Sequence, residues 1–339
     1  MIKLCTAQQI ISDIKRESAY MLERELCGMT GARHCVLTCG RDQGIEIALR
    51  AAGVKTGDTV ACPALGGPSL LHAVLCAGVQ PMFIDINPDT WMIDAQCLEY
   101  ALKRRMRTGQ VLPTAVIASN LFGALCEYTA LEMICRRHKI ALIEDMCGST
   151  GAIEGERQSG CFGDYSIALP AGSDGVACVF CRDWSGYYRL REYAKSLTAP
   201  TMVAVDMARQ SLLYLGRELK GRRRVAKEYQ KYFHGFAQTQ QIKSEYGSTY
   251  SSFVIELVDE HTAKITREKL EDKSLMDDSE MPLKLHELYK KESRSQAVMV
   301  NADIVAGRLL PLPIHHGMNS RVVAQIAKIA KSGNYSQLL

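Results

Sequence analysis

Two adjacent carboxylates follow a short apolar run near the middle of the chain. Residues 140–143 are apolar, and Glu144 and Asp145 come directly after them. This is the pattern of a buried parallel strand that delivers a carboxylate at its C-terminal end. Open α/β sheets bind their ligands at that end. The sequence therefore predicts a ligand site near Asp145.

A second pair of charged residues lies where an anion could bind. Residues 31–38 predict a strand, residues 39–43 a loop that contains Arg41 and Asp42, and residues 44–52 a helix. This layout directs the N–H groups of a helix N-terminus toward an anion. Arg41 would attract a phosphate, whereas Asp42 beside it would repel one. The loop is therefore either a degenerate phosphate site or a purely structural turn.

Further motifs occur along the chain in a fixed order. They are Gly57-Asp58-Thr59-Val60, GVQPMFIDI at residues 78–86, Asn120-Leu121-Phe122-Gly123 and RLLPLPIH at residues 308–315. With Glu144 and Asp145, these motifs resemble the DegT/DnrJ/EryC1/StrS family, the sugar aminotransferases of pyridoxal-phosphate fold type I. The resemblance covers nearly the whole chain.

The expected fold follows from the resemblance and from the alternation of strands and helices over residues 31–180. Such alternation favours a mainly parallel, doubly wound sheet. We expect an N-terminal helical arm over residues 1–27 and a large α/β domain over residues 28–200. A long linking helix and a small α+β domain should occupy residues 201–339.

The resemblance implies a pyridoxal phosphate cofactor, with Asp145 holding its pyridinium nitrogen and a lysine forming a Schiff base. No lysine occurs between Lys139 and Lys195. Gly172, Ser173 and Asp174 stand where the family lysine would align. Without an amine a Schiff base cannot form.

Four other family contacts to the cofactor are altered as well. The Ser-Gly-Thr phosphate loop is replaced by residues 40–42, and the stacking aromatic by Gly66 and Gly67. The Asn-Tyr-Arg segment that reaches the other subunit is replaced by residues 198–201. The side chain three residues after Asp145 is missing, because Gly148 stands there. Some relatives use a histidine in place of the lysine for a dehydration, but no histidine occurs between His138 and His234.

Three hypotheses remain. The joint losses favour a non-catalytic homologue that acts in sugar or polysaccharide biosynthesis by binding. An enzyme with a rebuilt aminotransferase or dehydratase site would use the polar groups of the same region, which are Arg41, Asp42, Asn120, Asp145, Ser173 and Asp174. A conventional sugar aminotransferase would need Lys195 or another distant lysine in the pocket.

The resemblance also predicts how the chain binds other molecules. We expect no covalent cofactor, and pyridoxal or pyridoxamine phosphate held non-covalently at most. We expect a homodimer or a heteromer with an active homologue, and a nucleotide-sugar in the cleft is the alternative binding role.

Composition limits the remaining classes of function. A net charge of +4 over 339 residues does not favour nucleic-acid binding, and no apolar run reaches the ~20 residues of a membrane span. The 13 cysteines are spread through apolar runs without a signal peptide, which favours a reducing cytoplasm. Cys178 and Cys181 lie in a strand-like segment and would face opposite sides of a sheet. The resemblance assigns His315 and His316 a structural role and not a metal site.

Overall fold

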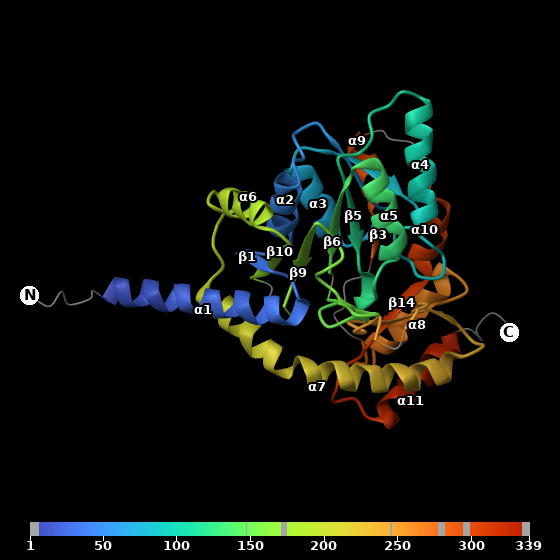
Figure 1. Cartoon of the computed structure of the whole chain (residues 1–339). Helices are drawn as coiled ribbons and strands as arrows, with labels where there is room; N and C mark the ends of the chain where they lie inside the picture. The colour runs from blue at the N-terminus through green and yellow to red at the C-terminus, as the bar shows by residue number, and fades with distance from the viewer. Residues whose placement is uncertain are drawn as a thin grey trace, which may run out of the picture.

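A seven-stranded sheet forms the centre of the larger domain (Figure 1). The computed structural model describes residues 7–146, 148–170, 175–244, 246–276, 282–293 and 299–333. The strands lie in the order β1 (His34–Thr38), β10 (Ala177–Cys181), β9 (Tyr165–Ala168), β6 (Ala141–Asp145), β5 (Ala115–Ser119), β2 (Thr59–Pro63) and β4 (Gln80–Ile84). The neighbours from β9 to β4 pair in parallel, and β10 is antiparallel to both β1 and β9. The prediction of a mainly parallel α/β sheet is therefore confirmed.

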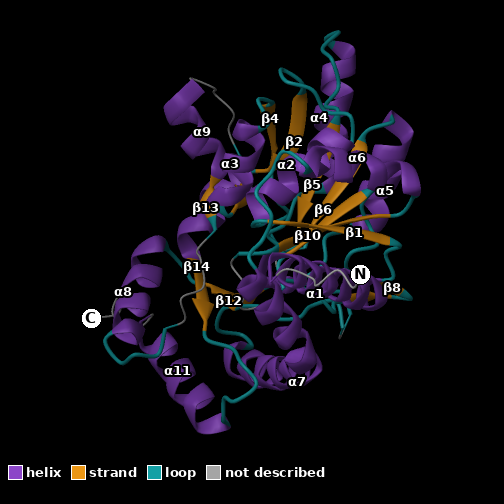
Figure 2. Cartoon of the chain, turned by 90° about the vertical axis from the view of Figure 1, so that its left-hand side faces the viewer, coloured by secondary structure: helices purple, strands orange, loops and turns teal. Residues whose placement is uncertain are grey.

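Helices cover both faces of this sheet (Figure 2). They are α1 (Ala7–Thr30), α2 (Arg41–Ala51), α3 (Pro68–Cys76), α4 (Ala95–Arg107), α5 (Tyr128–His138) and α6 (Trp184–Ala194). Helix α2 packs against β9, β10 and its neighbours α3 and α6. On the other side of β1 and β10, α1 meets the first turns of α7 (Met202–Phe233) around Leu26, Phe180 and Ala208.

The smaller domain has its own sheet and its own core. Strands β11 (Gln238–Thr239), β12 (Phe253–Glu256) and β14 (Leu309–Leu312) pair in that order. Helix α8 (Glu260–Glu271) packs against β14, and α11 (Ser320–Gly333) packs against α7 and α8. Helix α7 runs from the larger domain to the smaller one beneath the sheet (Figure 1). Its residues Tyr229 and Phe233 are fully buried in the smaller core.

One segment late in the chain returns to the larger domain. It contains β13 (Leu283–Lys284), α9 (Leu285–Ser293), α10 (Val300–Val305) and the 3-10 turn η2 (Ala306–Arg308). Strand β13 pairs antiparallel with β3 (Leu65–Gly66), and Leu285 lies in the larger core. Two shorter elements, the hairpin β7 (Ile153–Glu154) with β8 (Arg157–Gln158) and the turn η1 (Leu121–Gly123), complete the described chain.

The expected elements are present with small shifts. The expected long linking helix spans residues 202–233, and Asp94 caps α4 by accepting the N–H of Cys97 at 2.8 Å. One expectation was wrong in a way that affects the site. Arg41 and Asp42 do not lie in a loop, because α2 begins at Arg41. Gly40 precedes the helix with a φ of 91°, and this backbone conformation, which glycine adopts easily, makes the turn from β1 into α2 short.

Candidate functional site

Asp145 lies at the carboxyl end of the sheet with its side chain fully buried. The register of β5 and β6 places Ser119 directly beside it. The Ser119 hydroxyl donates a hydrogen bond to Asp145 Oδ2 at 2.7 Å. The predicted strand-end carboxylate is therefore present, in the place where open sheets bind ligands.

Arg41 reaches this carboxylate from the first turn of α2. Its Nε donates to Asp145 Oδ1 at 3.1 Å, and its Nη2 forms an ion pair with Oδ2. Its Nη1 donates to the hydroxyl of Ser69, near the start of α3, at 2.7 Å. The side chain of Arg41 is only 13% exposed. The guanidinium thus binds both oxygens of Asp145 in a bidentate pair.

Asp42 turns away from this pair. Its Oδ2 lies 2.7 Å from Nδ1 of His72 on α3, and its side chain is 41% exposed. Consecutive positions in the first turn of a helix point in different directions. Arg41 and Asp42 therefore do not converge on one ligand, and Arg41 is directed to the carboxylate and not to a phosphate.

Asn120 belongs to a separate buried network. Its Oδ1 accepts hydrogen bonds from the N–H of Cys126 at 3.0 Å and from the hydroxyl of Tyr128 at 2.8 Å. Its Nδ2 donates to Ser149 Oγ at 3.0 Å and to Glu144 Oε1 at 3.4 Å. Its donors and acceptor are used inside the protein, which gives Asn120 a positioning role in the loop after β5.

Glu144 is a buried carboxylate that sequence reasoning did not single out as a site residue. Its oxygens accept the N–H groups of Gly160 and Phe162, each at 3.0 Å. The hydroxyls of Ser159 and Ser166 donate to it at 3.1 and 2.9 Å. Burial raises its pKa, and these donors oppose that rise. Adjacent strand residues face opposite sides of a sheet, which separates Glu144 from Asp145.

The space beside Gly66 is covered by the chain itself. Strands β3 and β13 pair there, with Leu283 opposite Gly66. A Cβ atom on Gly66 would lie 3.2 Å from Cδ1 of Leu285. An aromatic side chain at this position would collide with that segment. Gly66 therefore fits the packing of α9, because a larger side chain there would meet Leu285.

A second segment, residues 248–251 of the smaller domain, covers the loops after β5 and β6. Thr249 donates its hydroxyl to the carbonyl of Gly148 at 2.8 Å and its N–H to the carbonyl of Gly123 at 3.0 Å. A Cβ atom on Gly148 would lie 2.9 Å from Cβ of Ser251. We call residues 248–251 the covering segment. It fills the space that a side chain three residues after Asp145 would need.

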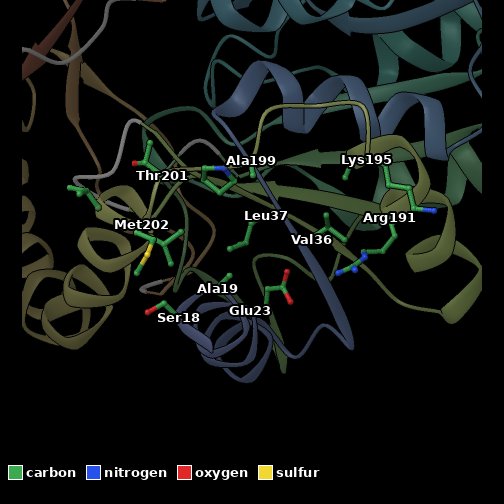
Figure 3. Close-up of a pocket in the computed structure, with 14 residues that line it drawn as sticks. Ser18, Ala19, Glu23, Val36, Leu37, Arg191, Lys195, Ala199, Thr201 and Met202 are labelled. Atoms are coloured by element: carbon green, nitrogen blue, oxygen red, sulfur yellow. The ribbon is translucent and has the colours of Figure 1, made fainter. Parts of the chain in front are cut away.

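An open cavity of about 770 Å³ lies elsewhere, between α1, β1, α6 and the start of α7 (Figure 3). Lys195 lines it and pairs with Glu192 at 2.5 Å. Thr201, from the loop before α7, also lines it and caps that helix by accepting the N–H of Ala204. Burial raises the pKa of Glu23 in this cavity to about 7, while the charge of Arg191 and the N–H of Leu37 lower it. Neither Asp145 nor Arg41 borders this cavity.

These residues do not fit the cofactor that the resemblance implies. Arg41 already occupies the face of Asp145 that a pyridinium nitrogen would need. Residues 140–194 contain no lysine, and Lys195 lines a different cavity. Gly172, Ser173 and Asp174 lie outside the described residues.

Two remaining sequence features have structural explanations. His316 Nδ1 pairs with Glu218 on α7, and His315 Nδ1 accepts the N–H of Gly317 at 3.2 Å.

Within the part of the chain that the structure describes, no helix is long and apolar enough to cross a membrane.

Known proteins resemble this chain in sequence and in fold. EpsN of Bacillus subtilis, named as a putative pyridoxal phosphate-dependent aminotransferase, is 34% identical over 145 residues. That match spans 43% of this chain and 37% of EpsN. An aminotransferase from Brucella abortus superposes with a TM-score of 0.82 at 19% identity, covering 95% of this chain and 93% of its own.

A putative sugar aminotransferase from Streptococcus pneumoniae, Spr1654, is similar in its PLP-form. Its TM-score is 0.83 at 17% identity, and the superposition covers 95% of this chain and 92% of Spr1654. These likenesses confirm pyridoxal-phosphate fold type I. The model of the DegT/DnrJ/EryC1/StrS aminotransferase family matches residues 6–168 and 201–331. The chain therefore belongs to the DegT/DnrJ/EryC1/StrS aminotransferase family.

Proposed function

We propose that this chain is a non-catalytic homologue of nucleotide-sugar aminotransferases, which acts in the cytoplasm by binding a second protein of sugar or polysaccharide biosynthesis. The observation that carries the proposal is the pairing of Arg41 with Asp145. A cofactor ring would have to displace a bidentate, largely buried guanidinium, and breaking a buried pair costs about 3–5 kcal/mol. The absence of a lysine from residues 140–194 supports the same conclusion independently.

The alternative is an aminotransferase or dehydratase with a rebuilt site. Two polar side chains that such a site would use make other contacts. Asn120 holds the loop after β5, and Asp42 pairs with His72 at the surface. Arg41, the evident donor for the diphosphate of a nucleotide-sugar, binds Asp145. These contacts favour a protein partner over a small-molecule ligand.

The first test concerns the cofactor. The purified protein is incubated with pyridoxal phosphate, reduced with borohydride and digested for peptide mapping. We expect no visible aldimine band and no reduced lysine adduct above the level of a denatured control. An adduct at one defined lysine would overturn the proposal and would identify the catalytic amine.

The partner surface is expected around the cavity of Figure 3. Val203 of α7 lines this cavity and is 69% exposed. The same two helices that border the cavity also expose Met207 (52%) on α7 and Tyr20 (57%) on α1. Helix α1 also extends beyond the body of the molecule (Figure 1). Exposed apolar patches of this kind favour association with another chain. We propose that this face forms a homodimer or a heteromer with an active homologue.

The second test concerns that partner. The chain is co-expressed with a lysine-bearing homologue and the pair is separated by size exclusion, with Val203→Asp as the variant that should weaken the complex. Val111→Asp is the matched control, because Val111 is 82% exposed and lies away from the cavity. If the two chains never co-purify and the homologue is fully active alone, the partner role is wrong.

A further inference from the structure

We propose that His286, Glu287 and Asp303 form a binding site for a divalent transition-metal ion where α9 meets α10. The ligand atoms that these three side chains offer, one from each, lie within 4.8 Å of one another. His286 Nε2 is 2.9 Å from Asp303 Oδ1. Ligand atoms around a tetrahedral ion with bonds of about 2.0–2.2 Å are roughly 3.3 Å apart. Small rotations of the side chains therefore suffice for three bonds to one ion.

The three side chains differ in exposure, and the difference gives an ion a way in. The side chain of His286 is completely buried, whereas those of Asp303 and Glu287 are 34% and 51% exposed. An ion from solvent therefore meets the carboxylates first, and the imidazole holds it from the protein side. Three protein ligands leave at least one coordination position for water. The site is thus open on its solvent side.

The second ring nitrogen of His286 is compatible with this role. Among the residues that the structure describes, Nδ1 of His286 is buried and has no hydrogen-bond partner. A metal ion binds the neutral imidazole, so ligation through Nε2 places the ring proton on Nδ1. Because Nδ1 has no partner, this change of tautomer breaks no hydrogen bond there. The hydrogen bond between His286 and Asp303 is exchanged for a bond from each side chain to the ion.

The ligand types select the class of ion. Mg²⁺ and Ca²⁺ prefer sites made of oxygen alone, whereas imidazole suits zinc, cobalt, nickel and iron. The two carboxylates supply negative charge, and Lys284 Nζ, 3.7 Å from Glu287 Oε1, offsets part of it. A long, partly exposed ion pair of this kind contributes little, so a divalent ion can compete with it. A bound ion would join α9 to α10.

Titration with Co²⁺ tests the site, because the visible absorption of cobalt reports its ligands. We expect the wild type to bind Co²⁺ without the near-ultraviolet band of a cobalt–thiolate bond, and Zn²⁺ to displace it. Asp303→Asn and Glu287→Gln, which keep the size of the side chain, should each weaken binding at least about tenfold. His72→Ala is the matched control, because His72 and Cys76, 3.5 Å apart, are another pair of possible ligands. Binding that survives in D303N, or that is lost only in H72A, would overturn the inference.

A second measurement locates the ion in the wild type, so it does not depend on how well the variants fold. Crystals soaked with Co²⁺ should show a peak of anomalous scattering about 2.0–2.2 Å from Nε2 of His286 and from a carboxylate oxygen of Asp303. A peak at His72 alone, or no peak at all, would contradict the proposed site.

Discussion

Replacement of Gly148 by alanine tests whether the covering segment packs tightly against the loop after β6. Gly148 has a φ of +79°, and an added Cβ would lie 2.9 Å from Cβ and 3.1 Å from Oγ of Ser251. The substitution therefore combines two costs. One is the left-handed backbone, and the other is the contact with residues 248–251.

Gly155 separates these two costs. It also has a positive φ, +61°, but a Cβ there would meet no atom within 4 Å. A left-handed alanine costs about 1–2 kcal/mol at either position. Overpacking against Ser251 should add about 1–3 kcal/mol for Gly148 alone. We therefore expect Gly148→Ala to destabilise the protein by about 2–5 kcal/mol and Gly155→Ala by about 1–2 kcal/mol.

Urea unfolding of both variants, followed by tryptophan fluorescence and by circular dichroism, measures the difference. The double variant G148A/S251G, compared with S251G alone, should recover the steric part of the loss. If G148A costs no more than G155A, or if removal of the Ser251 side chain recovers nothing, the covering segment does not press on the site and our account of Gly148 is wrong.

Three further predictions follow from buried or exposed groups elsewhere. Burial raises the pKa of Glu23 from 4.5 to about 7. The protonated Glu23 therefore stabilises the folded state below pH 4.5, and this stabilisation is lost as the pH rises through 7. The unfolding free energy of Glu23→Gln minus that of the wild type should therefore be larger at pH 8 than at pH 4.5. The increase should be at most about 3 kcal/mol before solvent screening is allowed for. Unfolding free energies of the two proteins that change in parallel with pH would refute this. Glu144→Gln places an amide against donors from Gly160 and Phe162 and should cost about 1–3 kcal/mol in urea unfolding, so an unchanged midpoint would contradict the network described here. Sedimentation at micromolar concentration should show a dimer, which Val203→Asp weakens, and a species of only 37.5 kDa would count against it.

The fold could be predicted from the sequence because the patterns that indicate helices and strands are local. The apolar run before Asp145 lies within one element, and the structure has a strand there as predicted. The start of α2 was misplaced, because Gly40 permits a sharper turn than the loop pattern indicated.

The contacts that decide the site could not be predicted in the same way. Arg41 and Asp145 are 104 residues apart, and their meeting depends on the direction of a side chain in the first turn of a helix. The contact between Gly66 and Leu285 depends on a pairing of β3 with β13, two strands of two residues each. Such short strands carry no periodic signal. The missing lysine could be read from the sequence, whereas the groups that now fill the space could be found only in three dimensions.

If the proposed function holds, the pairing of Arg41 with Asp145 also determines how many mutations would separate this chain from a catalytic homologue. One substitution could restore a lysine between residues 140 and 194, yet the guanidinium would still cover Asp145 and Leu285 would still lie against Gly66. Loss of the arginine first would leave a buried carboxylate without its bidentate partner, at a cost of several kcal/mol. Neither single step yields a working cofactor site, and the second weakens the fold. Under the proposed function, a gain of catalysis would therefore require several coordinated changes, and no single mutation would be enough.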